Sequence, residues 1–240
     1  MSFIAMAWRY LRYRWLVTGL TLAGIALGAA LVCGVLALRH ETERALATDA
    51  GLYDLVVGGK GSPLQLVLSS VYHLDEPPGN VPYVEYERML RDPRVAWAAP
   101  LGLGDNYRGF RIVGTEAPFF DLTDRDGNPF FSIARGRIFE DRFEVVLGSH
   151  VAAATGLDVG DTFAGTHGIV EVPGGEVHDE FPYVVSGVLA PTGSAQDRAI
   201  FGTLESVWEI HAADERLHSA IQGLATLGEE PEREASAILV

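Results

Sequence analysis

The sequence predicts an α+β protein with one N-terminal transmembrane helix, followed by a mixed α/β domain whose strands are mainly antiparallel. The first observation is an uncharged, proline-free stretch at residues 16–38. The second is the following region of about 200 residues, which is long enough for one or two compact units. In this region short apolar runs alternate with Gly, Pro and Asn turns, a pattern typical of short helices and hairpin strands.

The stretch at residues 16–38 is expected to cross a membrane. At about 1.5 Å per residue, a helix of this length spans roughly 30–35 Å, the thickness of a hydrocarbon core. A helix also satisfies its own backbone polar groups, which lipid cannot do. A cleaved signal peptide has a shorter apolar run of about 7–15 residues and a small-residue cleavage site, which this sequence lacks. A lipoprotein signal is disfavoured because Val32 precedes Cys33, the single cysteine.

The charges on either side of this helix predict its orientation. Arg9, Arg12 and Arg14 precede it, and basic residues beside a first helix tend to stay in the cytoplasm. Without these arginines, 15 basic residues remain against 32 acidic ones. We therefore expect residues 1–15 in the cytoplasm, residues 16–38 in the membrane and residues 39–240 outside. The acidity of the outer part argues against nucleic acid and anionic head groups as partners.

Two glycines within the membrane stretch form a candidate packing face. Gly24 and Gly28 are four residues apart, so they lie on one side of a helix and permit close helix–helix approach. The alternative is that glycine is simply frequent in membrane helices.

Local patterns place the elements of the outer part. We expect helices at 39–50 (continuing out of the membrane, with Gly51 as its stop), 64–72, 83–91, 149–155 and 203–211. We expect strands at 52–57, 95–99, 107–113, 144–147, 162–164, 183–189 and 237–240. Turns or loops are expected at 73–82, 104–106 and 116–137, a long hairpin at 168–182, and an acidic tail without clear pattern at 213–234. Ser149 and Thr203 are expected helix caps, and Gly156 an expected helix stop.

The sequence contains no pattern that indicates catalysis or nucleotide binding. Gly58, Gly59, Lys60 and Gly61 do not form a phosphate-binding loop, because Lys60 is followed by Gly instead of Ser or Thr. Ser149 and His150 are adjacent, and adjacent residues on a helix point to different sides. We therefore expect no catalytic residue and no cofactor.

Histidines are the weak candidates for a metal site. His73 lies beside two acidic residues, and His167 and His178 flank one predicted hairpin. A zinc site needs three or four converging ligands, and these histidines lack a compact ligand spacing. The alternative is that they form local hydrogen bonds. A membrane-anchored binding or scaffold module, responding to metal through these histidines, remains the second functional hypothesis.

Several stretches, in this order, resemble the permease subunits of the MacB/FtsX type of ABC transporters. The resembling segments are 8–12 (WRYLR), 54–65 (DLVVGGKGSPLQ), 71–83 (VYHLDEPPGNVPY), 144–148 (EVVLG), 156–161 (GLDVGD), 187–193 (GVLAPTG) and 205–208 (ESVW). The segments between 136 and 208 are similar to the MacB-like periplasmic core domain. The resemblance covers nearly the entire chain.

The resemblance implies a non-catalytic permease subunit of a bacterial inner membrane. Such a subunit couples a cytoplasmic ATPase, here on a separate chain, to an extracytoplasmic domain for export, lipoprotein extraction or mechanotransmission. It implies a permease homodimer or heterodimer, and its partners can include a periplasmic protein. Because the sequence stops in the apolar strand at 237–240, before the further membrane helices of such permeases, we expect a fragment with a C-terminally incomplete domain.

Overall fold

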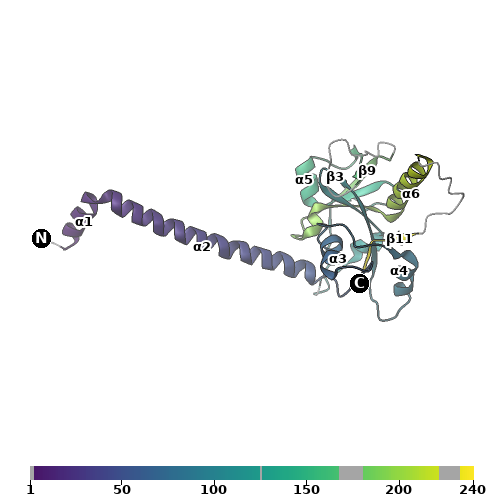
Figure 1. Ribbon diagram of the computed structural model, residues 1–240, viewed down its shortest axis with the longest axis horizontal. Coiled ribbons are helices and arrows are strands. Elements are labelled where there is room, and N and C mark those ends of the chain that lie inside the picture. Colours follow the sequence, from purple (N-terminus) through teal and green to yellow (C-terminus); the bar gives the residue numbers. More distant parts are fainter. Residues whose placement is uncertain (1–2, 125, 168–180, 222–232) are drawn as a thin grey trace. The chain divides into compact units, whose positions relative to one another are not determined.

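The computed structural model describes residues 3–124, 126–167, 181–221 and 233–240. The chain forms two compact units, Met1–Ala47 and Thr48–Val240. The first unit contains α1 (Phe3–Tyr13) and most of α2 (Trp15–Ala50) (Figure 1). The helix predicted at 16–38 with a continuation to residue 50 is therefore confirmed as one 36-residue helix. The separate helix α1 was not predicted.

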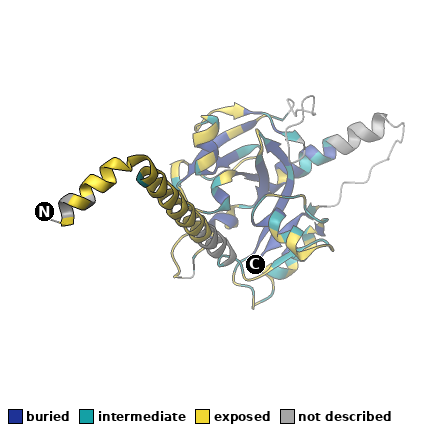
Figure 2. Ribbon diagram, turned by 60° about the vertical axis from the view of Figure 1, so that its left-hand side comes forward, coloured by how far each residue is buried: buried dark blue, intermediate teal, exposed yellow. Residues whose placement is uncertain are grey.

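Helix α2 has the composition and surface of a membrane-spanning helix. Its segment Trp15–Glu41 has a mean hydropathy of 2.3 and is long and apolar enough to cross a membrane. The described part of α2 is almost entirely exposed (Figure 2). Leu20, Leu27 and Leu31 are each at least 70% exposed. Large apolar side chains exposed along a whole helix are stable in lipid, where water does not oppose their exposure.

The second unit is built on a large mixed sheet. Its main path runs β1-β12-β3-β4-β10-β6-β9-β5, with β7 on β9 and β8 on β3, and β11 and β2 form a separate small sheet. The strands are β1 Val56–Gly58, β2 Val81–Pro82, β3 Ala99–Tyr107, β4 Phe110–Thr115, β5 Ile133–Gly136, β6 Glu144–Leu147, β7 Thr162–Phe163, β8 Thr166–His167, β9 Tyr183–Leu189, β10 Ala199–Thr203, β11 Glu234–Ala235 and β12 Ala237–Leu239. Only the β4–β10 and β6–β9 pairs are parallel among the described strands. The predicted α+β class with mainly antiparallel strands is confirmed.

Helices pack on this sheet and cover its core. They are α3 Pro63–Ser70, α4 Tyr83–Leu90, α5 Ser149–Thr155 and α6 Leu204–Ile221, with 3₁₀ turns η1 Ala117–Asp121 and η2 Ala195–Arg198. Phe119, Phe120, Phe131 and Phe201 form an aromatic cluster within one core. Helix α6 lies directly on Gly114, where an added Cβ would come within 2.5 Å of the Val207 side chain.

The predicted strand at 95–99 and turn at 104–106 are wrong. Strand β3 begins at Ala99 and continues through residues 104–106, and an irregularity between Leu103 and Asn106 accommodates them. The hairpin instead turns at Arg108 and Gly109, whose φ angles are 50° and 79°. Two consecutive positive φ angles match the right-handed twist of the paired strands, so Gly109 is favoured there. The return strand is accordingly β4, Phe110–Thr115, rather than 107–113.

The remaining predictions differ mainly at element ends. Strand β1 begins at Val56 rather than residue 52, and the predicted loop at 116–137 contains η1 and β5. Gly148 rather than Ser149 is the N-cap of α5, whereas Gly156 ends that helix with φ 77°, as predicted. The Thr203 cap is confirmed by a 3.3 Å bond from the Ser206 amide, but α6 continues to Ile221, beyond the predicted end at 211. Most of the predicted hairpin at 168–182 lies outside the described residues.

Candidate functional site

The candidate functional site is the junction, residues 51–58, through which the chain passes from α2 into the sheet. Leu52 and Tyr53 follow the end of α2 by two and three residues, and both pack against the aromatic core. The Tyr53 ring stacks on Trp97, with ring centroids 6.1 Å apart and planes at 23°. The membrane helix is thus followed at once by side chains fixed in the domain core.

Main-chain hydrogen bonds join the junction to the C-terminal strand β12. The amides of Asp54 and Leu55 donate to the Val240 carbonyl at 2.8 and 3.0 Å, and the Val240 amide donates to Leu55 at 2.9 Å. Strand β1 then pairs with β12, and β12 pairs with β3. Backbone hydrogen bonds therefore connect the junction through β1 and β12 to β3 in the sheet.

The glycines after the junction serve close packing. An added Cβ at Gly59 would lie 2.6 Å from the Gly79 backbone, and one at Gly61 would lie 2.5 Å from the Pro78 Cβ. A Cβ at Gly58 would collide with the Leu66 side chain of α3. The glycine run therefore brings residues 58–61 against α3 and the segment 78–79, which explains why it resembles a phosphate loop in composition alone.

Helix α3 buries polar residues on the side that faces the domain. Ser62 caps it, accepting from the Gln65 amide at 3.4 Å. Ser69 and Ser70 are fully buried, and their hydroxyls donate to the Leu66 carbonyl at 3.0 and 2.5 Å. Leu64, in contrast, is 67% exposed. Hydrogen bonding within the helix allows the two serines to be buried without cost from unpaired hydroxyls.

Gln196 links the junction to the segment after α3. Its Oε1 lies 2.9 Å from His73 Nε2, and its Nε2 donates to the Tyr53 hydroxyl and the Val71 carbonyl, each at 3.4 Å. An amide oxygen can only accept, so His73 carries its proton on Nε2. Burial disfavours the charged ring and lowers the pKa of His73 from 6.5 to about 4, although the bond to Gln196 opposes this. His73 is therefore a neutral structural donor.

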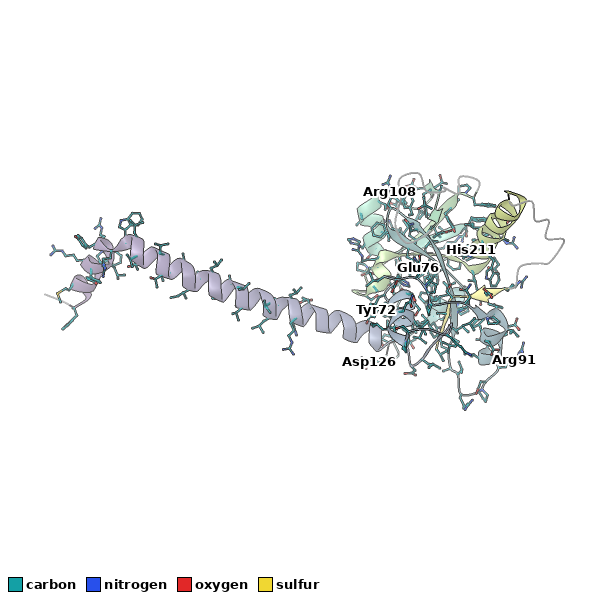
Figure 3. The ribbon with its side chains drawn as sticks, viewed as in Figure 1. Tyr72, Glu76, Arg91, Arg108, Asp126 and His211 are labelled. Carbon is teal, nitrogen blue, oxygen red and sulfur yellow. The ribbon has the colours of Figure 1, made fainter. Side chains whose placement is uncertain are left out.

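Arg111 lies beneath the same segment. It is 5% exposed, and its Nη2 donates to the Asp75 carbonyl at 3.5 Å. Burial lowers the pKa of Arg111, while the carboxylates of Glu76, Asp105 and Asp75 oppose that shift. Glu76 is labelled in Figure 3, and its carbonyl also accepts from Gln65 of α3 at 3.3 Å. Opposite charges from two strands and a loop thus hold the segment after α3 on β4.

The structure describes two of the three candidate histidines and both candidate packing glycines. His73 is bonded to Gln196, His167 lies in β8 with its main chain paired to Asp105, and His178 is outside the described residues. Within the described part of the chain, His, Cys, Asp and Glu side chains form no group of three that could hold a metal ion. Gly24 and Gly28 lie in α2, where an added Cβ would meet nothing within 4 Å.

The residues that build the site were missed by sequence reasoning. Tyr53, Arg111 and Gln196 belong to separate segments, and each is unremarkable in its local sequence. The one available signal was the polar character of Gln196 just before the apolar run 199–201, because a buried strand start needs its polar neighbours satisfied.

Among the described residues, one helix is long and apolar enough to cross a membrane, and a sheet domain follows it in the chain, which is the arrangement of a membrane-anchored domain. The family model described as the MacB-like periplasmic core domain matches residues 18–236. The chain belongs to this family, whose members are periplasmic domains of ABC-type transporter permeases. The family consists of generally non-catalytic components that assemble in a membrane with an ABC ATPase, and the predicted resemblance is confirmed.

The solved structures that match this chain have low sequence identity to it. The periplasmic region of MacB from Actinobacillus actinomycetemcomitans is 14% identical, with 82% of this chain and 78% of that chain covered and a TM-score of 0.45. The extracellular domain of the noncanonic ABC-type transporter YknZ from Gram-positive bacteria is 10% identical, with coverages of 78% and 83% and a TM-score of 0.38. No curated protein matches. The family assignment accordingly rests on the family model.

Proposed function

We propose that this chain is the membrane subunit of an ABC transporter, which passes movement from a cytoplasmic ATPase to an extracytoplasmic domain. The observation that carries the proposal is that the chain passes from α2 into the junction without an intervening loop. Helix α2 ends at Ala50, Tyr53 stacks on Trp97, and β1 begins at Val56. The connection after α2 is short and hydrogen-bonded to β12, which suits it to pass on a displacement of the helix.

The proposed orientation places residues 1–15 in the cytoplasm of a bacterial cell and residues 39–240 on the outer side of the inner membrane. The three arginines before α2 and the acidic composition after it support this arrangement. We further propose that the ATPase is supplied by a separate chain. The glycine run at 58–61 is a packing device and does not have the pattern of a phosphate-binding loop.

A second permease chain is the proposed partner of α2 in the membrane. The Gly24 and Gly28 face is open in the isolated helix and suits close packing against an identical or related helix. Among export, lipoprotein extraction and mechanotransmission, the bonded junction favours mechanotransmission to the sheet domain, which then acts on its substrate or on a periplasmic partner protein.

The proposal is tested by expressing the intact reading frame with the ATPase encoded beside it and purifying the complex in a bilayer. We expect the ATPase to copurify and to hydrolyse ATP. A membrane subunit that purifies alone, from a locus without an ATPase, refutes the proposal. Metal analysis of the same preparation tests the scaffold alternative, which a stoichiometric metal retained through His73 or His167 would support.

A further inference from the structure

Arg233 is an exposed arginine that has no acidic partner among the described residues. Other exposed arginines of the sheet domain do pair with a carboxylate within 4.0 Å, namely Arg88, Arg91, Arg94, Arg135, Arg137 and Arg142. The Arg233 guanidinium instead lies over the Trp208 ring, 5.5 Å from the ring centroid. Contact with an aromatic ring holds a guanidinium in place and leaves its N–H donors open to an anion.

A pocket of about 350 Å³ lies beside this arginine. Arg233 lines it together with Pro82, Tyr83, Val84 and Glu87, which belong to β2 and the first half of α4. Pockets of this size hold small ligands, usually through apolar walls and a few polar groups. Here Pro82 and Val84 supply apolar surface, and Arg233 supplies a positive charge at the same place.

The acidic residue of the pocket leaves this positive charge in excess. The Glu87 carboxylate pairs with Arg91 Nη2 at 3.3 Å, on the same helix. Two arginines therefore stand against one carboxylate in and beside the pocket. The site thus favours an anion, although the chain as a whole has a formal net charge of −14.

Hydrogen bonds and ring contacts fix the walls of the pocket. The Tyr83 amide donates to the Arg233 carbonyl at 2.9 Å, and Trp208 Nε1 donates to the Glu234 carbonyl at 2.6 Å. The Tyr83 and Trp208 rings meet edge to face, with centroids 5.2 Å apart. The Tyr83 hydroxyl donates to Glu116. The walls are thus held by contacts within the domain, as is usual for sites that are formed before a ligand binds.

We infer that this pocket binds a carboxylate attached to a small apolar body. The Arg233 guanidinium holds the carboxylate through two parallel N–H···O bonds, a geometry that suits arginine better than lysine. Pro82 and Val84 contact the apolar part of the ligand. A free organic acid and the C-terminal residue of a peptide both have this chemistry.

The inference is tested by isothermal titration of the full chain in phosphatidylcholine nanodiscs, in a buffer free of carboxylates. The probe is N-acetylleucine, for which we expect a Kd of about 1–5 mM. N-acetylleucinamide, which lacks the charge, and acetate, which lacks the apolar body, should each bind about fivefold more weakly or worse. Equal affinity for the acid and the amide, or no binding of N-acetylleucine at millimolar concentration, overturns the inference without any variant.

Two variants with the same change of charge assign the binding to Arg233. Arg233→Gln should weaken N-acetylleucine binding about fivefold or more, whereas Arg88→Gln should leave the Kd within about twofold. Arg88 pairs with Glu85 on the same helix α4 and does not line the pocket. An equal effect of both substitutions, or no effect of either, contradicts a specific role of Arg233.

A longer probe distinguishes the two sources of the ligand. Tighter binding of N-acetyl-alanyl-alanyl-leucine than of N-acetylleucine supports the C-terminus of a peptide, and equal binding supports a free acid. Neither titration requires an ATPase or nucleotide. Failure of the inference therefore leaves the proposed function untouched, and failure to copurify an ATPase leaves the inference untouched.

Discussion

Gln196 connects three parts of the domain through one amide side chain. It is fully buried and bonded to His73, to the Tyr53 hydroxyl of the junction and to the Val71 carbonyl at the end of α3. The amide oxygen accepts from His73, and the amide nitrogen donates to the Tyr53 hydroxyl and the Val71 carbonyl. At the scale of single residues, Gln196 is therefore a structural link between neutral groups. Its bond to His73 also fixes the His73 proton on Nε2.

The protonation of His73 predicts a pH dependence of stability. The unfolded chain binds a proton on this ring near the ordinary pKa of 6.5, and the folded chain only near 4. The stability is thus fully present above pH 6.5 and is lost as the pH falls toward 4. The loss reaches about 3 kcal/mol at its limit. Chemical unfolding followed by circular dichroism at several pH values measures this slope.

Two variants assign the slope to His73. His73→Gln should remove most of the pH dependence between 6.5 and 4.5, even where it lowers the overall stability. His150→Gln, at an exposed position, should retain the dependence. The hydrogen bonds from Arg137 lower the pKa of Glu144 to about 2. Glu144 therefore contributes to the pH dependence of stability only below pH 4.5. An unchanged slope in His73→Gln contradicts the buried neutral ring.

At the scale of elements, close approach of backbones shapes the sheet. Gly136 of β5 is paired with Gly187 of β9, and a Cβ at Gly187 would collide with the Arg137 carbonyl. Gly109, in contrast, has a positive φ of 79° with open space around it. Gly187 is required by crowding and Gly109 by its backbone conformation, so substitutions at these two positions have different costs in stability.

Alanine at these two glycines tests that distinction. Gly187→Ala should destabilise the domain by more than about 2 kcal/mol, because backbone must shift to admit the methyl group. Gly109→Ala should cost about 1 kcal/mol, the usual penalty for a left-handed residue with a side chain. Denaturant titration of both variants compares them. Equal losses would contradict the crowding between Gly187 and the Arg137 carbonyl.

The glycine face of α2 predicts association in the membrane. Gly24→Leu with Gly28→Leu should lower self-association roughly tenfold, since bulky side chains prevent close helix approach. Gly19→Leu is the matched control, because it lies on another side of the same helix and also has open space. Förster transfer between labelled chains in bilayers measures the association. Equal effects of all three substitutions would show that the face has no packing role.

Local sequence patterns were sufficient for elements whose ends are chemically marked. Residues 144–147, 149–155 and 183–189 were predicted with the observed bounds because turn residues and glycines flank them. The β3 strand was misplaced because Gly104-Asp105-Asn106 has turn composition, while pairing with β4 and β8 holds it extended. The candidate site could not be predicted, because residues 53, 73, 111 and 196 meet only through the order of strands in the sheet.

At the scale of the whole molecule, the proposed function gives the chain one mechanical role. Under the proposed function, α2 moves at the membrane, the junction carries the movement, and the β1–β12–β3 path receives it. The path consists of hydrogen-bonded backbone from Asp54 and Leu55 through Val240. A flexible insertion between Ala50 and Gly51 should therefore abolish transmission without removing any partner contact of the domain.

The most direct measurement is ATP-dependent hydrogen exchange at β1 and β12 in the complex of this chain with its ATPase. We expect the exchange of Val56–Gly58 and Ala237–Leu239 to change when the ATPase is trapped with nucleotide and vanadate. A four-residue Gly/Ser insertion after Ala50 should eliminate that change while ATP hydrolysis persists. The same nucleotide-dependent change with and without the insertion, or no change in the unmodified chain, would contradict transmission through the junction.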